Sequence, residues 1–271
     1  MKFTKMIVCG VDFLITIYEE NVDYSNVAIK VLDRINGIGA NRLIVAKTKI
    51  LEMIVYEPSG RRELFNANAL VCFAKYIFDN DICKKNEMVI LTGAGKTKLE
   101  VAQEIPFMAR LNLDKPNFNN RMIYVNDSID SFGRVIRLDD TLLTIYSFNL
   151  LGVNTVLFTE DIDNKNTLDL IPRIAEYKIF NRKTDVLLVK VIDKKTLRVR
   201  CYKPGLGFIN TNGSGCGAAL VAASKLGYIR GKVTCILDEG SIIPEIDKKG
   251  NVFVCISAKK IYECDYSEEE Y

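Results

Sequence analysis

Glycines and small polar residues precede a strongly apolar run near the carboxyl end of the chain. Residues 210–215 read NTNGSG, and residues 216–226 carry hardly a polar side chain. Alanine and leucine favour helix and Gly227 favours its end, so we predict a helix over residues 214–226. A helix that is apolar on nearly every face must be buried. Its first backbone N–H groups lack partners and carry partial positive charge, so this end suits a carboxylate or another anion.

Histidine is absent from the chain, whereas cysteine is common. The absence of histidine excludes Ser-His-Asp and Cys-His nucleophile systems and every zinc site that uses histidine. No two cysteines have CxxC spacing, and we interpret them as reduced, buried thiols of a cytoplasmic protein. The eight cysteines lie mostly within apolar runs, at positions 9, 72, 83, 201, 216, 235, 255 and 264.

Three short motifs imitate ligand sites. Residues 92–97 (TGAGKT) resemble the end of a phosphate-binding loop, but Ile90 stands where that loop needs a glycine, so we predict a hairpin turn. Residues 213–217 (GSGCG) lack the glycine spacing of a dinucleotide fingerprint. Asp139 and Asp140, and likewise Asp161 and Asp163, are typical of solvated loops. We therefore expect no metal and no cofactor.

Composition describes an ordinary globular protein. The 271 residues are 48% hydrophobic and 26% charged, with a formal net charge of +3, which fits one large domain or two moderate ones. Lys and Arg are scattered, so we expect no nucleic acid partner. No stretch approaches the ~20 apolar residues of a membrane helix, so we expect no membrane association. Asp12 interrupts the first apolar run, and we interpret residues 1–18 as a strand rather than a signal peptide.

Alternating apolar segments predict a chain that is mainly β-strand. Helices are predicted at residues 26–34, 69–78, 167–177 and 214–226. Strands are predicted at residues 3–17, 42–55, 88–91, 98–105, 122–125, 141–148, 155–159, 186–192, 197–202, 233–237 and 252–258.

Two of these helices, 69–78 and 214–226, are apolar nearly all round and each lies among strands, which predicts two similar halves. The polar residues 114–120, which include a proline, are the expected linker. We assign residues 1–117 to the amino-terminal half, to which residues 259–271 can return, and residues 118–258 to the carboxyl-terminal half. A cleft between the halves is the expected binding site.

Ordered signatures along nearly the whole chain resemble the diaminopimelate epimerase family. The resemblance implies an α/β protein of two pseudo-symmetric domains, each a curved mixed sheet wrapped around one central buried helix. The matching segments are residues 1–6 with Gly10, Asp12 and Phe13, then 33–34, 37–40, 65–67, 72–76, 197–200, 205–207 and 213–215.

The resemblance also implies a chemistry, which is racemisation at an α-carbon without pyridoxal phosphate. In that family two cysteines, one at the start of each central helix, face each other across the substrate. One takes the proton as a thiolate and the other returns a proton to the opposite face. Helix amino ends favour thiolates, and a placed acid or base contributes roughly 10²–10⁴-fold to the rate.

Several positions of this chain depart from the family pattern. Asn212 replaces one catalytic cysteine, and the segment that carries the other is absent between residues 65–67 and the helix. Cys72 matches a structural cysteine of that helix. Substrate-binding positions have changed as well: Val11 and Asp185 stand for asparagines, Lys203-Pro204 for a Glu-Arg pair, and Gly152-Val-Asn154 for a longer Gly-Asn-Pro-His segment.

We expect the ligand to contact small polar residues at the starts of the central helices and in the loops beside them. These are Asn66, Asn68, Asn154, Asn212, Gly213, Ser214 and Gly215.

Three functions are compatible with these residues. The first is a protein of this fold that lacks epimerase activity and binds a small anionic, amino-acid-like metabolite or a protein partner. The second is an amino-acid racemase, epimerase or isomerase with a relocated acid/base pair, for which Cys216 and Asp185 are the candidates. Alternatively, Cys216 has only a structural role as a small buried thiol. The third is diaminopimelate epimerase itself. Homodimers are common in the family, so a homodimer is expected by analogy alone.

Overall fold

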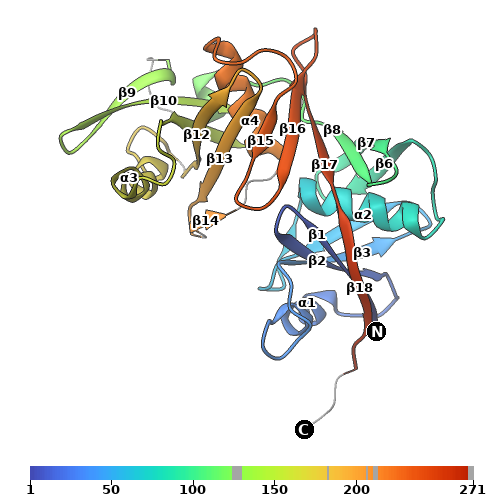
Figure 1. Ribbon diagram of the computed structural model, residues 1–271. Helices are drawn as coiled ribbons and strands as arrows, with labels where there is room; N and C mark the ends of the chain where they lie inside the picture. The colour runs from blue at the N-terminus through green and yellow to red at the C-terminus, as the bar shows by residue number, and fades with distance from the viewer. Residues whose placement is uncertain (124–129, 182, 206, 210–212, 268–271) are drawn as a thin grey trace. The chain divides into compact units, whose positions relative to one another are not determined.

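The computed structural model describes residues 1–123, 130–181, 183–205, 207–209 and 213–267 (Figure 1). The chain forms two compact units, which are described separately. Unit 1 comprises Met1–Leu111 together with the chain from Cys255 onward, and unit 2 is Asn112–Val254. No helix in the described part of the chain is long and apolar enough to cross a membrane.

Unit 1 is a mixed sheet with one buried helix, α2 (Ala67–Asp79), and one amphipathic helix, α1 (Tyr24–Leu32). Most neighbouring strands are antiparallel, but β2 runs parallel to β3 because α1 provides the crossover between them. Its strands are β1 (Lys2–Val8), β2 (Val11–Ile17), β3 (Arg42–Lys47), β4 (Glu52–Tyr56), β5 (Arg62–Glu63), β6 (Glu87–Thr92), β7 (Gly95–Gln103), β8 (Met108–Asn112) and β18 (Lys259–Asp265).

The first predicted strand is in fact a hairpin. Cys9 and Gly10 have φ values of 46° and 76°, so the chain turns between β1 and β2 instead of continuing to residue 17 as one strand. The predicted segment 42–55 likewise divides into β3 and β4, with Leu51 at φ 47°. Both strands of a hairpin have alternating apolar residues, so the sequence pattern alone predicted one long strand in each case. The predicted turn within residues 92–97 is confirmed, because Thr92 pairs with Gly95 across β6 and β7.

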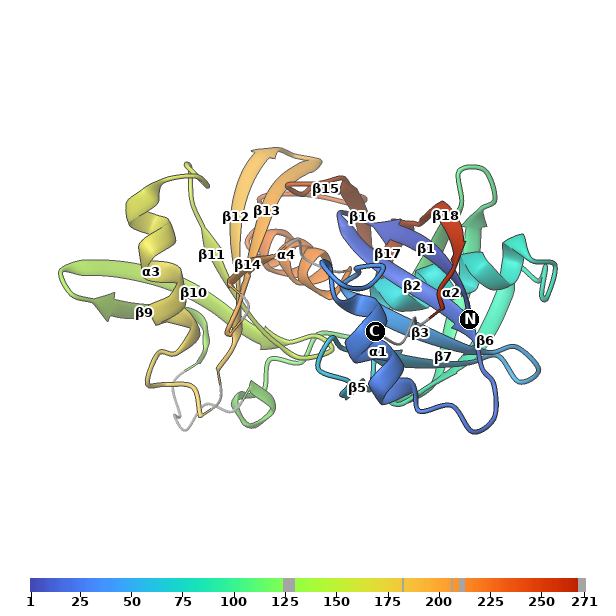
Figure 2. The ribbon, with the colours of Figure 1, turned by 90° about the horizontal axis from the view of Figure 1, so that it is seen from below.

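Helix α2 is apolar on almost every side and is buried in unit 1. Leu70, Val71, Cys72, Phe73 and Ala74 are all inaccessible to solvent. The helix packs against β1, β2, β3 and β4, and Figure 2 shows it among the strands of its own unit. Its amino end is therefore held inside the unit by apolar packing.

Unit 2 repeats the plan of a mixed sheet with one buried helix, α4 (Gly213–Lys225). Helix α4 packs against β11, β12, β13 and β16, while the amphipathic helix α3 (Lys165–Ala175) covers an apolar cluster around Ile171 and Ile174. The strands are β9 (Phe132–Leu138), β10 (Thr141–Asn149), β11 (Val153–Phe158), β12 (Asp185–Asp193), β13 (Thr196–Lys203), β14 (Gly207–Ile209), β15 (Thr234–Ile236) and β16 (Ser241–Ile246), with a 3₁₀ helix η1 (Asn120–Ile123). Strand β17 (Val252–Ser257) begins in unit 2 and continues into unit 1.

Close packing and a glycine stop define helix α4. A β-carbon on Gly217 would lie 2.9 Å from Leu113 Cδ1 and 3.1 Å from Leu150 Cδ2, so only glycine lets these leucines approach the helix. The helix ends at Lys225, and Gly227, two residues beyond it, has φ +74°. There the N–H of Gly227 donates to Ser224 O and that of Tyr228 to Ala223 O, which satisfies the last carbonyls.

Two predicted features differ from the structure near the expected linker. Unit 2 already begins at Asn112, because the backbone of Leu113 and Asp114 bonds to Val252. Residues 122–123 belong to η1 rather than to a strand, and residues 124–125 lie outside the described part. Asparagine side chains favour turns over a strand in the residues that lead into η1. Asn117 Oδ1 accepts the Asn119 N–H and Asn119 Oδ1 accepts the Arg121 N–H, each at 2.9 Å.

Asp12 ties together the segments that carry the amino-terminal family signatures. Its carboxylate accepts two hydrogen bonds from Arg34, at 3.2 and 2.7 Å, and lies 3.1 Å from Lys5 Nζ. It also accepts the backbone N–H of Asn41 at 3.0 Å. Burial opposes ionisation of Asp12, but the hydrogen bonds from Arg34 and Lys5 outweigh it and hold the pKa of this carboxyl below its usual value.

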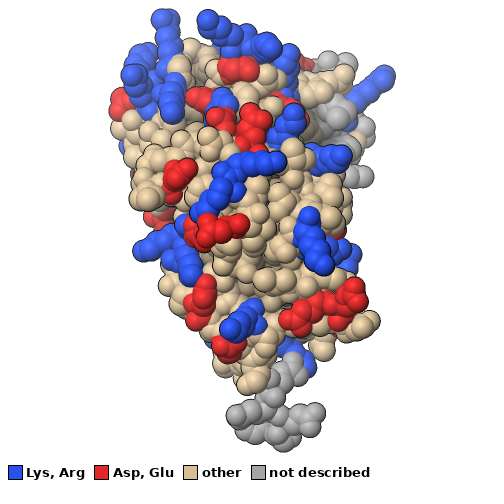
Figure 3. All heavy atoms as spheres, turned by 90° about the vertical axis from the view of Figure 1, so that its right-hand side faces the viewer, with Lys and Arg blue, Asp and Glu red and all other residues tan. Residues whose placement is uncertain are grey.

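Charges of both signs are mixed on the face drawn in Figure 3, where Lys and Arg stand beside Asp and Glu over much of the surface. Ion pairs of the described chain include Arg61 with Glu57 and Lys260 with Glu263. Such exposed pairs contribute little to stability.

We predict that Asp12→Asn lowers the free energy of unfolding by about 1–3 kcal/mol at neutral pH, because charged hydrogen bonds of Arg34 and Lys5 are lost. Since the folded pKa is depressed, this stabilisation exists above the unfolded pKa of about 3.9 and disappears as the pH falls through the folded pKa. Urea titrations from neutral to acidic pH measure it. The exposed Asp265→Asn is the control, and an equal loss in both variants would contradict the role of Asp12.

Candidate active site

The amino end of α2 is capped by Asn66. Its Oδ1 accepts the N–H of Ala69 at 3.0 Å, and its Nδ2 donates to Glu63 Oε2 at 3.2 Å. Glu63 in turn accepts a 2.9 Å hydrogen bond from Arg42 Nε. No residue separates this asparagine from the helix, whose first residue is Ala67. Asn66 therefore caps the helix, and no residues intervene between it and α2 in which the family resemblance would place a catalytic thiol.

Asn68 lies in the first turn of α2 and is only 3% exposed. Its Oδ1 is buried, and no described residue donates a hydrogen bond to it. A buried acceptor without a donor costs about 1–3 kcal/mol, so this oxygen marks a place where a donor is needed. The positively polarised amino end of α2 lies beside it.

The amino end of α4 borders a hollow of about 310 Å³ in unit 2. Gly213 and Gly215 begin the helix and are buried, whereas Ser214 faces the hollow. Three predicted site residues, Asn154, Asp185 and Ser214, meet here. Asn212 directly precedes Gly213 in the sequence but lies outside the described residues.

Two lysines that the prediction did not count as site residues, Lys183 and Lys203, also line this hollow. Lys203 was noticeable in the sequence because it departs from the family pattern. Lys183 gave no signal, since an exposed lysine is ordinary, and it forms an ion pair with Glu176 at 2.5 Å.

Asn154 shapes the wall of the hollow. It is 5% exposed, and its Nδ2 donates to Leu150 O at 3.1 Å and to Gly152 O at 2.9 Å. Gly152 has φ +131°, a conformation that favours glycine. Both donor hydrogens of Asn154 therefore hold the loop that precedes β11.

Asp185 is the titratable group most clearly placed for chemistry here. It begins β12, directly opposite Asn154 in the parallel β11–β12 pair. Burial raises the pKa of its carboxyl, and the charge of Lys203 offsets only part of that shift. A raised pKa moves a carboxyl toward the range in which it can donate and accept a proton near neutral pH.

Three cysteines, Cys9, Cys72 and Cys216, do not resemble catalytic thiols. Cys216 is fully buried in the second turn of α4, and its backbone oxygen lies 3.8 Å from Cys235 Sγ. Burial raises the pKa of Cys72 strongly and that of Cys9 to about 11. Reactive cysteines have depressed pKa values and accessible sulfur atoms.

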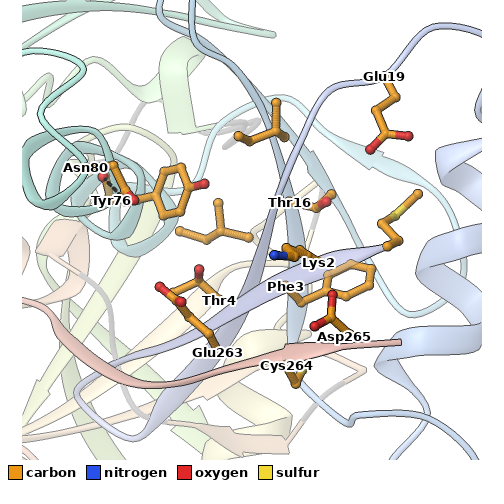
Figure 4. A pocket seen from close by; sticks show the side chains of 13 residues that line it. Lys2, Phe3, Thr4, Thr16, Glu19, Tyr76, Asn80, Glu263, Cys264 and Asp265 are labelled. Atoms are coloured by element: carbon orange, nitrogen blue, oxygen red, sulfur yellow. Dashed lines mark hydrogen bonds between the residues drawn. The ribbon is translucent and has the colours of Figure 1, made fainter. Parts of the chain in front are cut away.

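A second hollow, of about 580 Å³, lies in unit 1 (Figure 4). It is formed by β1, β2 and β18 with the carboxyl end of α2, where Asn80 Nδ2 donates to Tyr76 O at 2.8 Å. None of the predicted site residues lines it. Size alone is therefore a poor guide to the candidate site.

Sequence comparison finds relatives along nearly the full length of the chain. A diaminopimelate epimerase of Caldanaerobacter subterraneus subsp. tengcongensis is 28% identical over 268 residues, which cover 97% of this chain and 98% of the relative. One of Clostridium perfringens is 29% identical over 260 residues, with 92% and 94% covered. The chain is a homologue of diaminopimelate epimerases. No family model matches it.

Solved structures show the same fold at low sequence identity. A putative phenazine biosynthesis PhzC/PhzF protein from Clostridium difficile aligns with a TM-score of 0.70 at 12% identity, covering 99% of this chain and 100% of that one. A hydroxyproline epimerase from Agrobacterium vitis aligns with a TM-score of 0.66 at 9% identity, covering 97% and 91%. The predicted resemblance and the predicted two-domain α/β epimerase-like fold are confirmed.

We predict that Asp185→Asn increases the free energy of unfolding at neutral pH. A carboxyl whose folded pKa is raised destabilises the folded state above that pKa, and the penalty vanishes as the pH falls below the unfolded value of about 3.9. Chemical denaturation at several pH values measures the gain. Lys203→Met should raise the Asp185 pKa further, as seen by NMR titration; a fall would contradict the assigned interaction.

Proposed function

We propose that this homologue binds a small amino-acid-like anion and lacks the two-thiol epimerase reaction. One observation carries the proposal: an asparagine directly precedes each central helix, Asn66 before Ala67 and Asn212 before Gly213. Two-thiol epimerisation needs a thiol in front of each helix, but Asn212 stands in front of α4 and no residues separate Asn66 from α2. An amide side chain neither gains nor loses a proton near neutral pH.

The rest of unit 2 supports binding. Carboxylate ligands suit the amino end of a buried helix, here with the Ser214 hydroxyl beside it and the lysines at 183 and 203 around the same hollow. Asp185 supplies a counter-charge for an ammonium group when it is ionised. In unit 1, a ligand N–H would satisfy the unpaired Oδ1 of Asn68. The groups that line the unit 2 hollow fit an amino acid, which carries a carboxylate and an ammonium group together.

An isomerase with a relocated acid/base group is the second candidate, and the raised pKa of Asp185 favours it. The homologues and the neighbours of known structure are epimerases, racemases and isomerases, so any catalysis by this chain falls in that class. The buried position of Cys216 supports its role as a packed thiol over a role as the partner of Asp185.

Incubation in D₂O with diaminopimelate and a panel of amino acids separates the two functions. We expect no loss of the α-proton signal by NMR, while one of the compounds raises the melting temperature. Lys203→Met should abolish that rise, whereas the exposed Lys248→Met should preserve it. Exchange that Asp185→Asn or Cys216→Ala abolishes would refute the binding function in favour of the isomerase.

We also predict that neither Asn66→Cys nor Asn212→Cys alone restores turnover, because each leaves the opposite face of the substrate without a partner. Asn66→Cys should in addition lower stability by about 1 kcal/mol through loss of the helix cap. Asn66→Asp, which keeps an acceptor for the Ala69 N–H, is the control for stability. Measurable α-proton exchange by either single cysteine variant contradicts the proposed loss of both thiols.

A further inference from the structure

A third hollow, of about 600 Å³, lies at the carboxyl end of α4 in unit 2. Its lining combines aromatic, aliphatic and acidic side chains that the proposed function does not use. Helix α4 has thirteen residues, so its two ends are separated by ~20 Å and this hollow is distinct from the one at Ser214. We propose that it binds an organic cation with a methylated ammonium group.

Two aromatic rings form a corner in this hollow. The rings of Phe158 and Tyr228 have centroids 5.2 Å apart and planes at 86°. Tyr146 packs against Phe158 at 5.7 Å and 71°, which fixes the Phe158 ring from another direction. A group placed in a corner between perpendicular rings can touch both, and aromatic faces attract cations through their negative quadrupole.

Electrostatics at the rim also favour a cation. Glu160 and Asp193 line the hollow, and no described residue forms an ion pair with either carboxylate. Among the described residues, the one donor to the Asp193 carboxylate is the Lys195 backbone N–H, at 2.7 Å. The carboxyl end of a helix carries partial negative charge, and α4 ends two residues before Gly227, which lines the hollow. Lys194 is the opposing charge among the lining residues.

The aliphatic part of the lining selects the kind of cation. Val189 and Val191 of β12 line the hollow beside the two rings, so much of the contact surface offers no hydrogen bond. A primary ammonium has three N–H donors that need acceptors. A methylated ammonium carries its charge behind methyl groups, which pack favourably on aromatic and valine side chains.

Choline and its neutral isostere 3,3-dimethylbutan-1-ol test the proposal as a matched pair. We expect choline to shift the amide resonances of Gly227 and Tyr228 in a saturable manner in ¹H–¹⁵N spectra of the intact chain. The isostere has the same shape without the charge and should bind at least several-fold more weakly. Equal binding of the two compounds, or no shift with choline at any concentration that keeps the protein folded, would overturn the proposal.

Variants assign the binding to individual side chains. Tyr228→Leu should weaken choline binding by roughly two- to fivefold, the range of a partly exposed cation–π contact. Lys194→Met should strengthen it, because it removes the opposing charge. Tyr262→Leu, at a comparably exposed tyrosine of unit 1, should leave it unchanged. A Tyr262 variant that weakens binding as much as the Tyr228 variant, or a Lys194 variant that weakens it, would contradict the assigned pocket.

Discussion

The buried amino ends of α2 and α4 are the constraint on which the rest of the structure depends. The first N–H groups of a helix have no partner within the helix, and burial denies them water. At α2 a neighbouring side chain satisfies one of these groups, because Asn66 accepts the Ala69 N–H. Asn66 donates in turn to Glu63, which accepts a hydrogen bond from Arg42. At α4 the first turn borders a hollow with two lysines and a carboxyl of raised pKa. The sheets that surround both helices keep these ends inside their units.

Under the proposed function, this constraint explains how the fold persists without the two-thiol chemistry. A cap needs only an acceptor at the position before the helix, so an asparagine there stabilises the helix whether or not the site turns over substrate. A proton-transfer reaction needs a titratable group at the same position and a second one on the other side of the substrate. Capping is a requirement of folding, whereas proton transfer is a requirement of catalysis. An asparagine meets the requirement for a cap but not the requirement for a titratable group.

The two units use glycine and charge for different purposes. Gly217 lets Leu113 and Leu150 approach α4 closely, and Gly227 follows the end of that helix. In unit 1 a charged residue connects the segments. Asp12 of β2 accepts hydrogen bonds from Arg34, which follows α1, and from Asn41, which precedes β3. Helix α4 has a hollow beside each of its ends, one lined by Ser214 and the other by Gly227 and Tyr228.

The sequence alone determined the resemblance to diaminopimelate epimerases, the two buried helices and the small polar residues at their starts. Motifs and the apolar character of a helix depend on residues that are close together in the sequence. They can therefore be recognised from residue types and spacing alone. Only the tertiary structure showed that Asn66 caps α2, that Asn154, Asp185 and Ser214 share one hollow with Lys183 and Lys203, and that residues 3–17 form a hairpin. Each of these depends on which distant segments pack together or on the φ angle of a turn residue, and burial by those segments is what raises the pKa of Asp185.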